Sequence, residues 1–76
     1  MPEQIPELTP VSSSHLDAVG YDEDTQILYV QWKGGEISAY ENVPAVVASD
    51  FQKAPSPGKA FNSMIRDKYQ HHYVES

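Results

Sequence analysis

Apolar and polar residues alternate in the first half of the chain, and this alternation predicts β-strands. In residues 27–32 it puts Tyr29 on one side of the strand and Trp32 on the other, and the β-branched and aromatic residues of this run favour the extended conformation. Related patterns occupy residues 16–21 and residues 37–43.

Short polar or glycine-rich stretches connect these segments. The run 22–25 consists of acidic and hydroxyl residues, and the second connection contains Gly34 and Gly35, which adopt positive φ angles at little cost. Connections this short join antiparallel strands, so we expect a meander of three strands.

The period of the pattern changes after Val43, from two residues to between three and four. Pro44 suits the first turn of a helix, because its fixed φ is helical and it has no N–H to leave unpaired. Val47 and Phe51 are four residues apart and therefore share one helix face. We expect this helix to run to about Ala54.

A second helix is expected after Pro55. Ser56 is a favourable N-cap, and Pro57 suits the first helical position. At 100° per residue, the apolar side of this helix consists of Phe61, Met64, Ile65 and Tyr69. We expect the helix to end at about Tyr69.

These elements predict an α+β fold of two layers: a small three-stranded antiparallel meander followed by two helices packed on one face of the sheet. The other face would stay partly open, and a second copy of the chain or a ligand could cover it. The 76 residues allow one small domain.

The two ends of the chain show little apolar patterning. Residues 1–10 contain three of the six prolines, so we expect a flexible leader. Residues 11–69 would form the domain, and residues 70–76 a loose tail.

The net charge of −6 is unevenly distributed. Residues 1–50 carry one cation and nine acids, whereas residues 51–76 carry four cations and two acids. An acidic protein repels long polyanions, so we expect no binding to duplex DNA. A locally basic surface is still compatible with a short anion, although the acidic residues can equally serve solubility alone.

Composition excludes several kinds of chemistry. With no cysteine, the chain has no disulfide, thiolate nucleophile or thiolate metal site. The sequence shows neither an apolar run of membrane-spanning length nor a secretory signal, so we expect a cytoplasmic protein that binds no membrane. His15, His71 and His72 lack metal-ligand spacing, and no set of nucleophile, base and orienting residue is evident. We expect no enzymatic activity, no metal and no cofactor.

The last helix combines the residue types that bind phosphate. Lys59, Asn62 and Arg66 share one side of the predicted helix, and Arg66 can make a bidentate contact. Ser56 and the amides of Gly58 and Lys59 lie where a helix N-terminus attracts anions. The alternative is a capped surface helix with solvated cations.

Aromatic residues offer stacking surfaces. Tyr40 and Tyr69 are the candidates for stacking on a base, although aromatic residues on strands more often belong to the core.

The order and spacing of these residues resemble the KTSC domain. The motifs that carry the resemblance are Val11-Ser12-Ser13-Ser14-His15-Leu16, Val19-Gly20-Tyr21-Asp22, Leu28-Tyr29-Val30-Gln31-Trp32, Gly35, Tyr40, Val43-Pro44, the run from Ala54 to Asn62, Ile65-Arg66 and Tyr69.

The resemblance implies a compact module without enzymatic activity. The family is named for the C-terminus of some lysyl-tRNA synthetases and also occurs as small stand-alone proteins of bacteria and phages. The fusion to a synthetase suggests RNA binding. One departure concerns the Tyr-x-Tyr motif of the family, whose first tyrosine is replaced here by Ser38.

Two function hypotheses follow. The first is a non-catalytic module that binds a phosphate-bearing ligand, which it could thereby sequester: a nucleotide, a cyclic or short oligonucleotide, or RNA. The second is a protein-interaction or assembly module that uses aromatic residues on the open sheet face, with Trp32 or Tyr29 and Tyr40 as contacts.

Overall fold

The structure is a computed structural model that describes residues 5–74. Within these residues the chain forms an antiparallel sheet of five strands in the order β1-β2-β3-β4-β5, so every strand pairs with its neighbour in sequence. The strands are β1 (Thr9–Pro10), β2 (Leu16–Asp22), β3 (Ile27–Trp32), β4 (Ile37–Tyr40) and β5 (His71–Val74).

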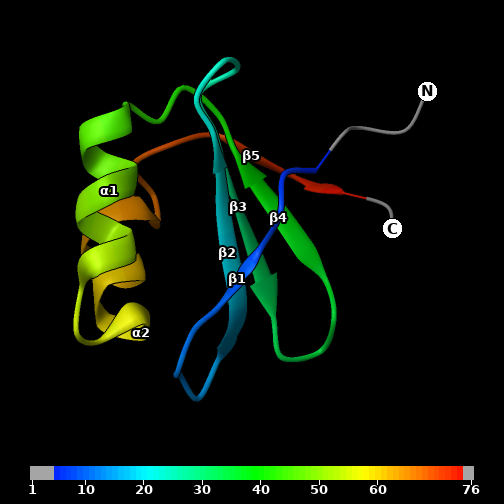
Figure 1. The fold of residues 1–76 in the computed structure, drawn as a ribbon, viewed down its shortest axis with the longest axis vertical. Helices are drawn as coiled ribbons and strands as arrows, with labels where there is room; N and C mark the ends of the chain where they lie inside the picture. Colours follow the sequence, from blue (N-terminus) through cyan, green and yellow to red (C-terminus); the bar gives the residue numbers. More distant parts are fainter. Residues whose placement is uncertain (1–4, 75–76) are drawn as a thin grey trace.

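The helical layer lies between β4 and β5 in the chain and covers one face of the sheet (Figure 1). It consists of α1 (Ala45–Lys53), α2 (Pro57–Ala60) and a π-helical turn, η1 (Phe61–Ile65). The α+β class, the meander and the placement of two helices on one face are therefore confirmed, whereas the sheet has five strands and not three.

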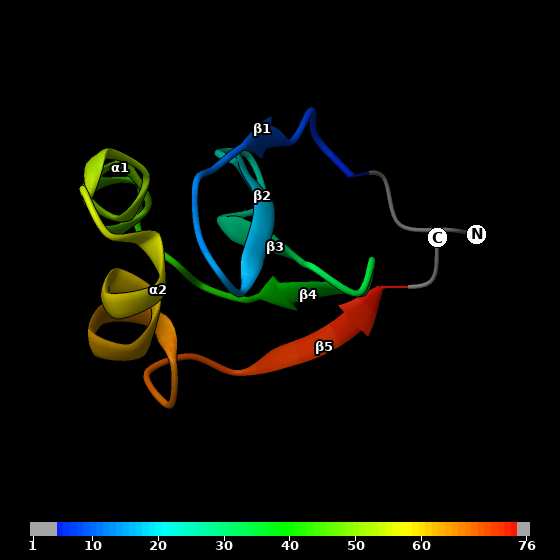
Figure 2. The same ribbon diagram turned by 90° about the horizontal axis from the view of Figure 1, so that it is seen from below.

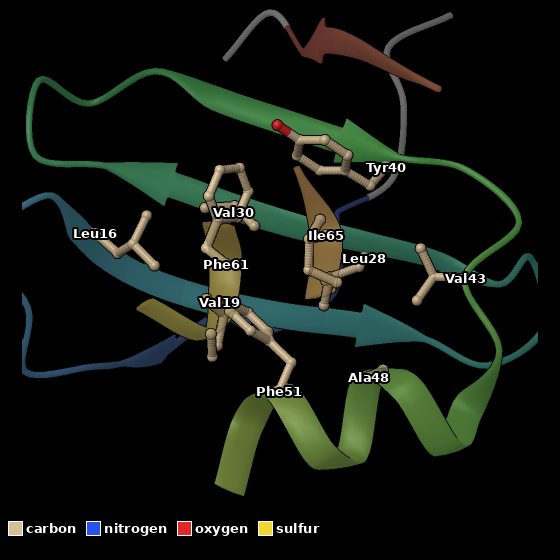
Figure 3. Packing of buried hydrophobic residues seen from close by; sticks show 11 residues of the cluster. Leu16, Val19, Leu28, Val30, Tyr40, Val43, Ala48, Phe51, Phe61 and Ile65 are labelled. Atoms are coloured by element: carbon tan, nitrogen blue, oxygen red, sulfur yellow. The ribbon is translucent and has the colours of Figure 1, made fainter. Parts of the chain in front are cut away.

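The main core lies between the sheet and the helices (Figure 3). Leu28 and Val30 of β3 are fully buried there, and they meet Phe51 of α1 and Phe61 of η1. The predicted alternation of β3 is confirmed, because Tyr29 belongs to a separate cluster with Ile37 and Ala39.

The opposite face of the sheet is less open than expected. Ile5 and Leu8 pack against the cluster of Tyr29, Ile37 and Ala39, and Tyr29 is only 1% exposed. The N-terminal segment therefore supplies a partial cover that the sequence pattern did not reveal.

The expectation of unstructured ends is wrong for the parts described. Thr9 pairs with Val19 and Pro10 with Ala18, so the end of the expected leader is an edge strand. Residues 71–74 pair along the whole of β4, where the sequence predicted a loose tail. Residues 1–4 of that leader and 75–76 of that tail lie outside the described residues.

The last helix is shorter than predicted and changes type. Ser56 is its N-cap and Pro57 its first residue, as expected, although no side-chain hydrogen bond from Ser56 caps the helix. The N–H of Arg66 donates to the carbonyl of Phe61, five residues earlier, at 2.8 Å, which is the π-helical bond. The helix ends at Ile65 and not near Tyr69, because Arg66 is extended and Asp67 has a φ of 62°.

A candidate ligand pocket between the helices and β4–β5

A pocket of about 500 Å³ opens beside η1, on the helix side of the sheet. Part of its lining belongs to the segment in which the chain leaves η1 and returns to the sheet as the edge strand β5, the strand drawn in red in Figure 2. Its lining residues come from widely separated segments: His15, Leu16, Trp32, Tyr40, Gly58, Phe61, Asn62, Arg66, Asp67, Tyr69 and His71.

Aromatic rings form one wall of this pocket. The ring of Phe61 is contacted edge-on by Trp32, with centroids 5.0 Å apart, and by Tyr40 at 5.5 Å. The imidazole of His71 stacks on Tyr40, with centroids 4.9 Å apart and planes at 27°. Edge-to-face and offset stacked rings hold one another in fixed orientations, so this wall is preorganised.

A hydrogen bond within the sheet fixes the orientation of Trp32. Its Nε1–H donates to the Oγ of Ser38 on the adjacent strand at 3.0 Å, and Ser38 is 1% exposed. In the resemblance described above, Ser38 occupies the position of the first tyrosine of the Tyr-x-Tyr motif. Its hydroxyl satisfies the indole while leaving the rest of the half-buried Trp32 at the pocket.

Arg66 provides the positive charge of the pocket. It follows η1 directly, and its Nε lies 3.9 Å from the Oδ2 of Asp67. Both side chains are largely exposed, 65% and 90%, so this ion pair contributes little and leaves the guanidinium available to a ligand. Asp67 also lines the pocket and opposes the binding of an anion there.

The hydroxyl of Tyr40 stays protonated over a wide pH range. Burial is the main cause that raises its pKa above the ordinary value of 10.0. The neighbouring Tyr73 raises this pKa further, Arg66 lowers it, and Asp67 raises it. At neutral pH the hydroxyl is therefore an uncharged hydrogen-bonding group.

A second hollow, of about 360 Å³, adjoins the first. It lies between the loop before β2 and the start of α2, and its lining consists of Ser12, Ser13, Ser14, His15, Pro55, Ser56, Pro57, Gly58, Lys59 and Asn62. Ser13 shapes its loop side, because its Oγ accepts hydrogen bonds from the N–H groups of His15 and Leu16 at 3.2 and 3.3 Å. His15, Gly58 and Asn62 line both hollows.

The structure divides the predicted phosphate site between these hollows. Arg66 lines the first, whereas Ser56 and Lys59 line the second. Gly58 and Asn62 lie at the junction. The helical period predicted that Lys59 and Arg66 share one side of the last helix, but in the structure they line neighbouring hollows.

The predicted stacking residues both line the first hollow, but in different environments. Tyr69 is half-buried, whereas Tyr40 is 5% exposed and its ring already contacts His71 and Phe61. Sequence reasoning missed Trp32, His15 and His71 as pocket residues. His15 and Trp32 both belong to motifs of the resemblance, whereas His71 lies outside them.

The aromatic surface expected on the open sheet face is not formed by the residues named for it. Tyr29 is buried on one face and Tyr40 on the other, and Trp32 packs against the main core. These three residues therefore do not share one exposed aromatic surface on that face of the sheet.

Residues 5–74 contain neither a cluster of metal-binding side chains nor a membrane-spanning helix. No three histidine, aspartate or glutamate side chains in that range gather closely enough to hold a metal ion. None of the helices in the same range has the length and apolar character needed to cross a membrane.

Comparison with known proteins places the fold and the sequence in one family. The family model of the KTSC domain matches residues 12–69. A KTSC domain protein from Yersinia pestis, known from its crystal structure, is 30% identical and superimposes with a TM-score of 0.87, covering 91% of this chain and 97% of its own. A protein from Tsukamurella paurometabola is 35% identical over 63 residues, which are 83% of this chain and 94% of the relative.

Longer relatives contain a similar segment. A lysine–tRNA ligase from Nostoc punctiforme is 34% identical over 57 residues, which make up 75% of this chain and 10% of the ligase. A ligase from another Nostoc strain shows 32% identity over 58 residues, 76% of this chain and again 10% of the ligase. The family model, the small relatives and the fold agree, and the chain belongs to the KTSC domain family.

Proposed function

We propose that the protein is a non-catalytic module that binds a nucleotide unit of RNA in the pocket beside η1. The observation that carries the proposal is the juxtaposition of Arg66 with a preorganised aromatic wall. An arginine recognises phosphate, and aromatic faces bind bases; a nucleotide needs both.

Each part of the pocket has a role in this proposal. Arg66 pairs with the phosphate, and the amide of Asn62 supplies a hydrogen bond. Trp32, Tyr69 and His71 offer ring surface to the base, because they remain accessible whereas Tyr40 is stacked within the protein. Tyr40 supports His71 from behind, so its role in stacking is indirect.

The size and the charge of the molecule favour a small or single-stranded ligand. The pocket volume of about 500 Å³ lies within the range of small-molecule sites. The net charge of −6 opposes the approach of a long duplex, whereas a local cation still attracts one or two phosphates.

The relatives add support from outside the structure. Similar segments form part of proteins named lysine–tRNA ligase, and this name states that those proteins act on tRNA. A phosphate-binding aromatic pocket suits such a setting. We propose that the protein acts in the cytoplasm, where RNA and nucleotides occur. Tight binding would also sequester the bound nucleotide.

A titration followed by NMR tests the proposal. A ¹⁵N-labelled sample receives the four ribonucleoside 5′-monophosphates and short RNAs, and each amide is observed. The single tryptophan gives one indole N–H signal, that of Trp32, at the aromatic wall. We expect saturable shifts of this signal and of the amides of Asn62 and Arg66.

A matched pair of variants assigns the effect. Arg66→Ala removes the guanidinium, and we expect affinity to fall by about tenfold or more. Lys68→Ala changes the net charge equally but removes a cation that lines neither hollow, so its effect should be small. If none of the nucleotides or RNAs causes saturable shifts in a folded sample, the proposal is refuted.

A further inference from the structure

The two hollows are neighbours that share part of their lining, and together they are called the groove. His15, Gly58 and Asn62 belong to both. Beyond this junction the groove has one cation on each side, Arg66 in the aromatic pocket and Lys59 in the neighbouring hollow. A mononucleotide in the pocket would leave the second hollow and its lysine unused.

The two halves of the groove differ in chemical character. The first has the aromatic wall and Arg66, while the second is lined mainly by serines, prolines and Lys59. The ring in the second half is the imidazole of His15, which also lines the first half, so this half offers a base little stacking surface, whereas its hydroxyl groups and lysine suit the sugar–phosphate backbone. The groove therefore matches a chain with a base at one end and its continuing backbone at the other.

Gly58 lies where the two hollows meet, because it lines both of them. A Cβ built on Gly58 would lie 3.5 Å from the Oγ of Ser13, across the junction between α2 and the loop before β2. That distance is an ordinary van der Waals contact, so alanine fits without a clash and adds a methyl group beside Ser13 at this junction.

We propose that the groove binds at least two successive nucleotides of single-stranded RNA: one base lies in the aromatic pocket, and the backbone crosses Gly58 to reach Lys59. This inference rests on the proposed function and specifies the length and path of the ligand. Lys59 then contacts a phosphate that a mononucleotide does not have.

The test compares ligands of one and two units. The probes are the four ribonucleoside 5′-monophosphates and the four 5′-phosphorylated homodinucleotides, titrated at two salt concentrations. We expect the best dinucleotide to bind about tenfold or more tightly than the matching monophosphate, because it adds a charge-assisted contact. Its affinity should also fall more steeply with salt, because it neutralises one more phosphate.

Variants separate the second contact from the first. Lys59→Ala should remove most of the dinucleotide's advantage and leave monophosphate affinity within about twofold, whereas Arg66→Ala weakens both ligands. Lys53→Ala is the matched control, since Lys53 ends α1 and lines neither hollow. Gly58→Ala should weaken dinucleotides several-fold while the protein stays at least as stable, because alanine favours the helix.

The results of these titrations test the two-nucleotide groove separately from the proposed function. If monophosphates bind in an Arg66-dependent way but dinucleotides bind no more tightly, the two-unit groove is overturned while the proposed function stands. If neither ligand class binds the folded protein, the proposed function fails and this inference fails with it. Dinucleotide affinity unchanged in Lys59→Ala would also overturn the path proposed for the backbone.

Discussion

The imidazole of His71 stacks on the phenol ring of Tyr40, although 31 positions separate them in the chain. Their strands pair in the sheet, and the two residues are direct partners in the β4–β5 register. This pair places an exposed imidazole over a buried tyrosine at the edge of the pocket. It therefore links the stability of the last strand to the shape of the candidate site.

Replacing His71 should cost more stability than replacing its neighbour. His71→Ala removes the stacked contact, and we expect the free energy of unfolding to fall by about 0.5–1.5 kcal/mol. His72→Ala is the control: its Nδ1 lies 3.1 Å from the Oε2 of Glu41 in an exposed pair, which is worth less. Urea denaturation measures both. Equal losses would mean that the stack with Tyr40 adds nothing.

Stability should decrease at alkaline pH through Tyr40. Because burial raises its pKa in the folded state, the hydroxyl is neutral in both states below about pH 10, and its contribution to stability is then complete. As pH rises through the folded pKa, the unfolded state ionises first and this contribution is lost. The pKa of Tyr21 is also raised, mainly by burial and then by Glu23 and Asp22, so it acts in the same direction.

Urea midpoints measured from about pH 8 to about pH 11 test this expectation. The Tyr40→Phe variant should show a smaller decrease across that range than the parent protein, with the remainder due in part to Tyr21. Identical pH profiles for the two proteins would contradict a raised pKa at Tyr40.

Removing the charge of Asp67 should strengthen anion binding. Its carboxylate accompanies Arg66 at the pocket, and a unit charge at about 4 Å in water is worth about 1 kcal/mol, or about fivefold in affinity. Asparagine tolerates the φ of 62° at this position, so Asp67→Asn should keep the turn. Titration with the ribonucleotide that binds best measures the gain. Weaker binding by a variant that folds normally would be inconsistent with phosphate at Arg66.

Gly20 allows the N-terminal segment to lie against β2. A Cβ at this position would be 2.8 Å from the Cδ2 of Leu8 and 2.9 Å from the backbone oxygen of Glu7. Gly20→Ala should therefore displace that segment and destabilise the protein by about 1–3 kcal/mol. The matched control is Gly34→Ala, because nothing lies within 4 Å of a Cβ there. Thermal unfolding that is the same for both variants would disprove this close packing.

Local patterns were sufficient where short-range contacts decide the structure. The alternation in β3 correctly separated Tyr29 from Trp32, because successive residues of any strand point to opposite faces. Pro57 correctly marked the first residue of the last helix, since its ring fixes φ wherever it stands. These features follow from each residue and its immediate neighbours.

The prediction failed where a distant partner decides the conformation. His71–Val74 has no strong strand pattern of its own, and it becomes β5 because β4 offers a free edge for hydrogen bonding. The helix was expected to continue past Ile65, but the π-helical bond from Arg66 to Phe61 and the left-handed φ of Asp67 end it. The helical period of the sequence gives no sign of either.

The amino-acid sequence alone determined the family resemblance, the meander, the start of the last helix and the identity of the cations. Tertiary structure alone decided that Arg66 and Lys59 face different hollows, and that Trp32 and His71 join them at one groove. The physical reason is that strand pairing and the end of η1 set these positions. Both depend on contacts between residues far apart in the chain, which no local pattern encodes.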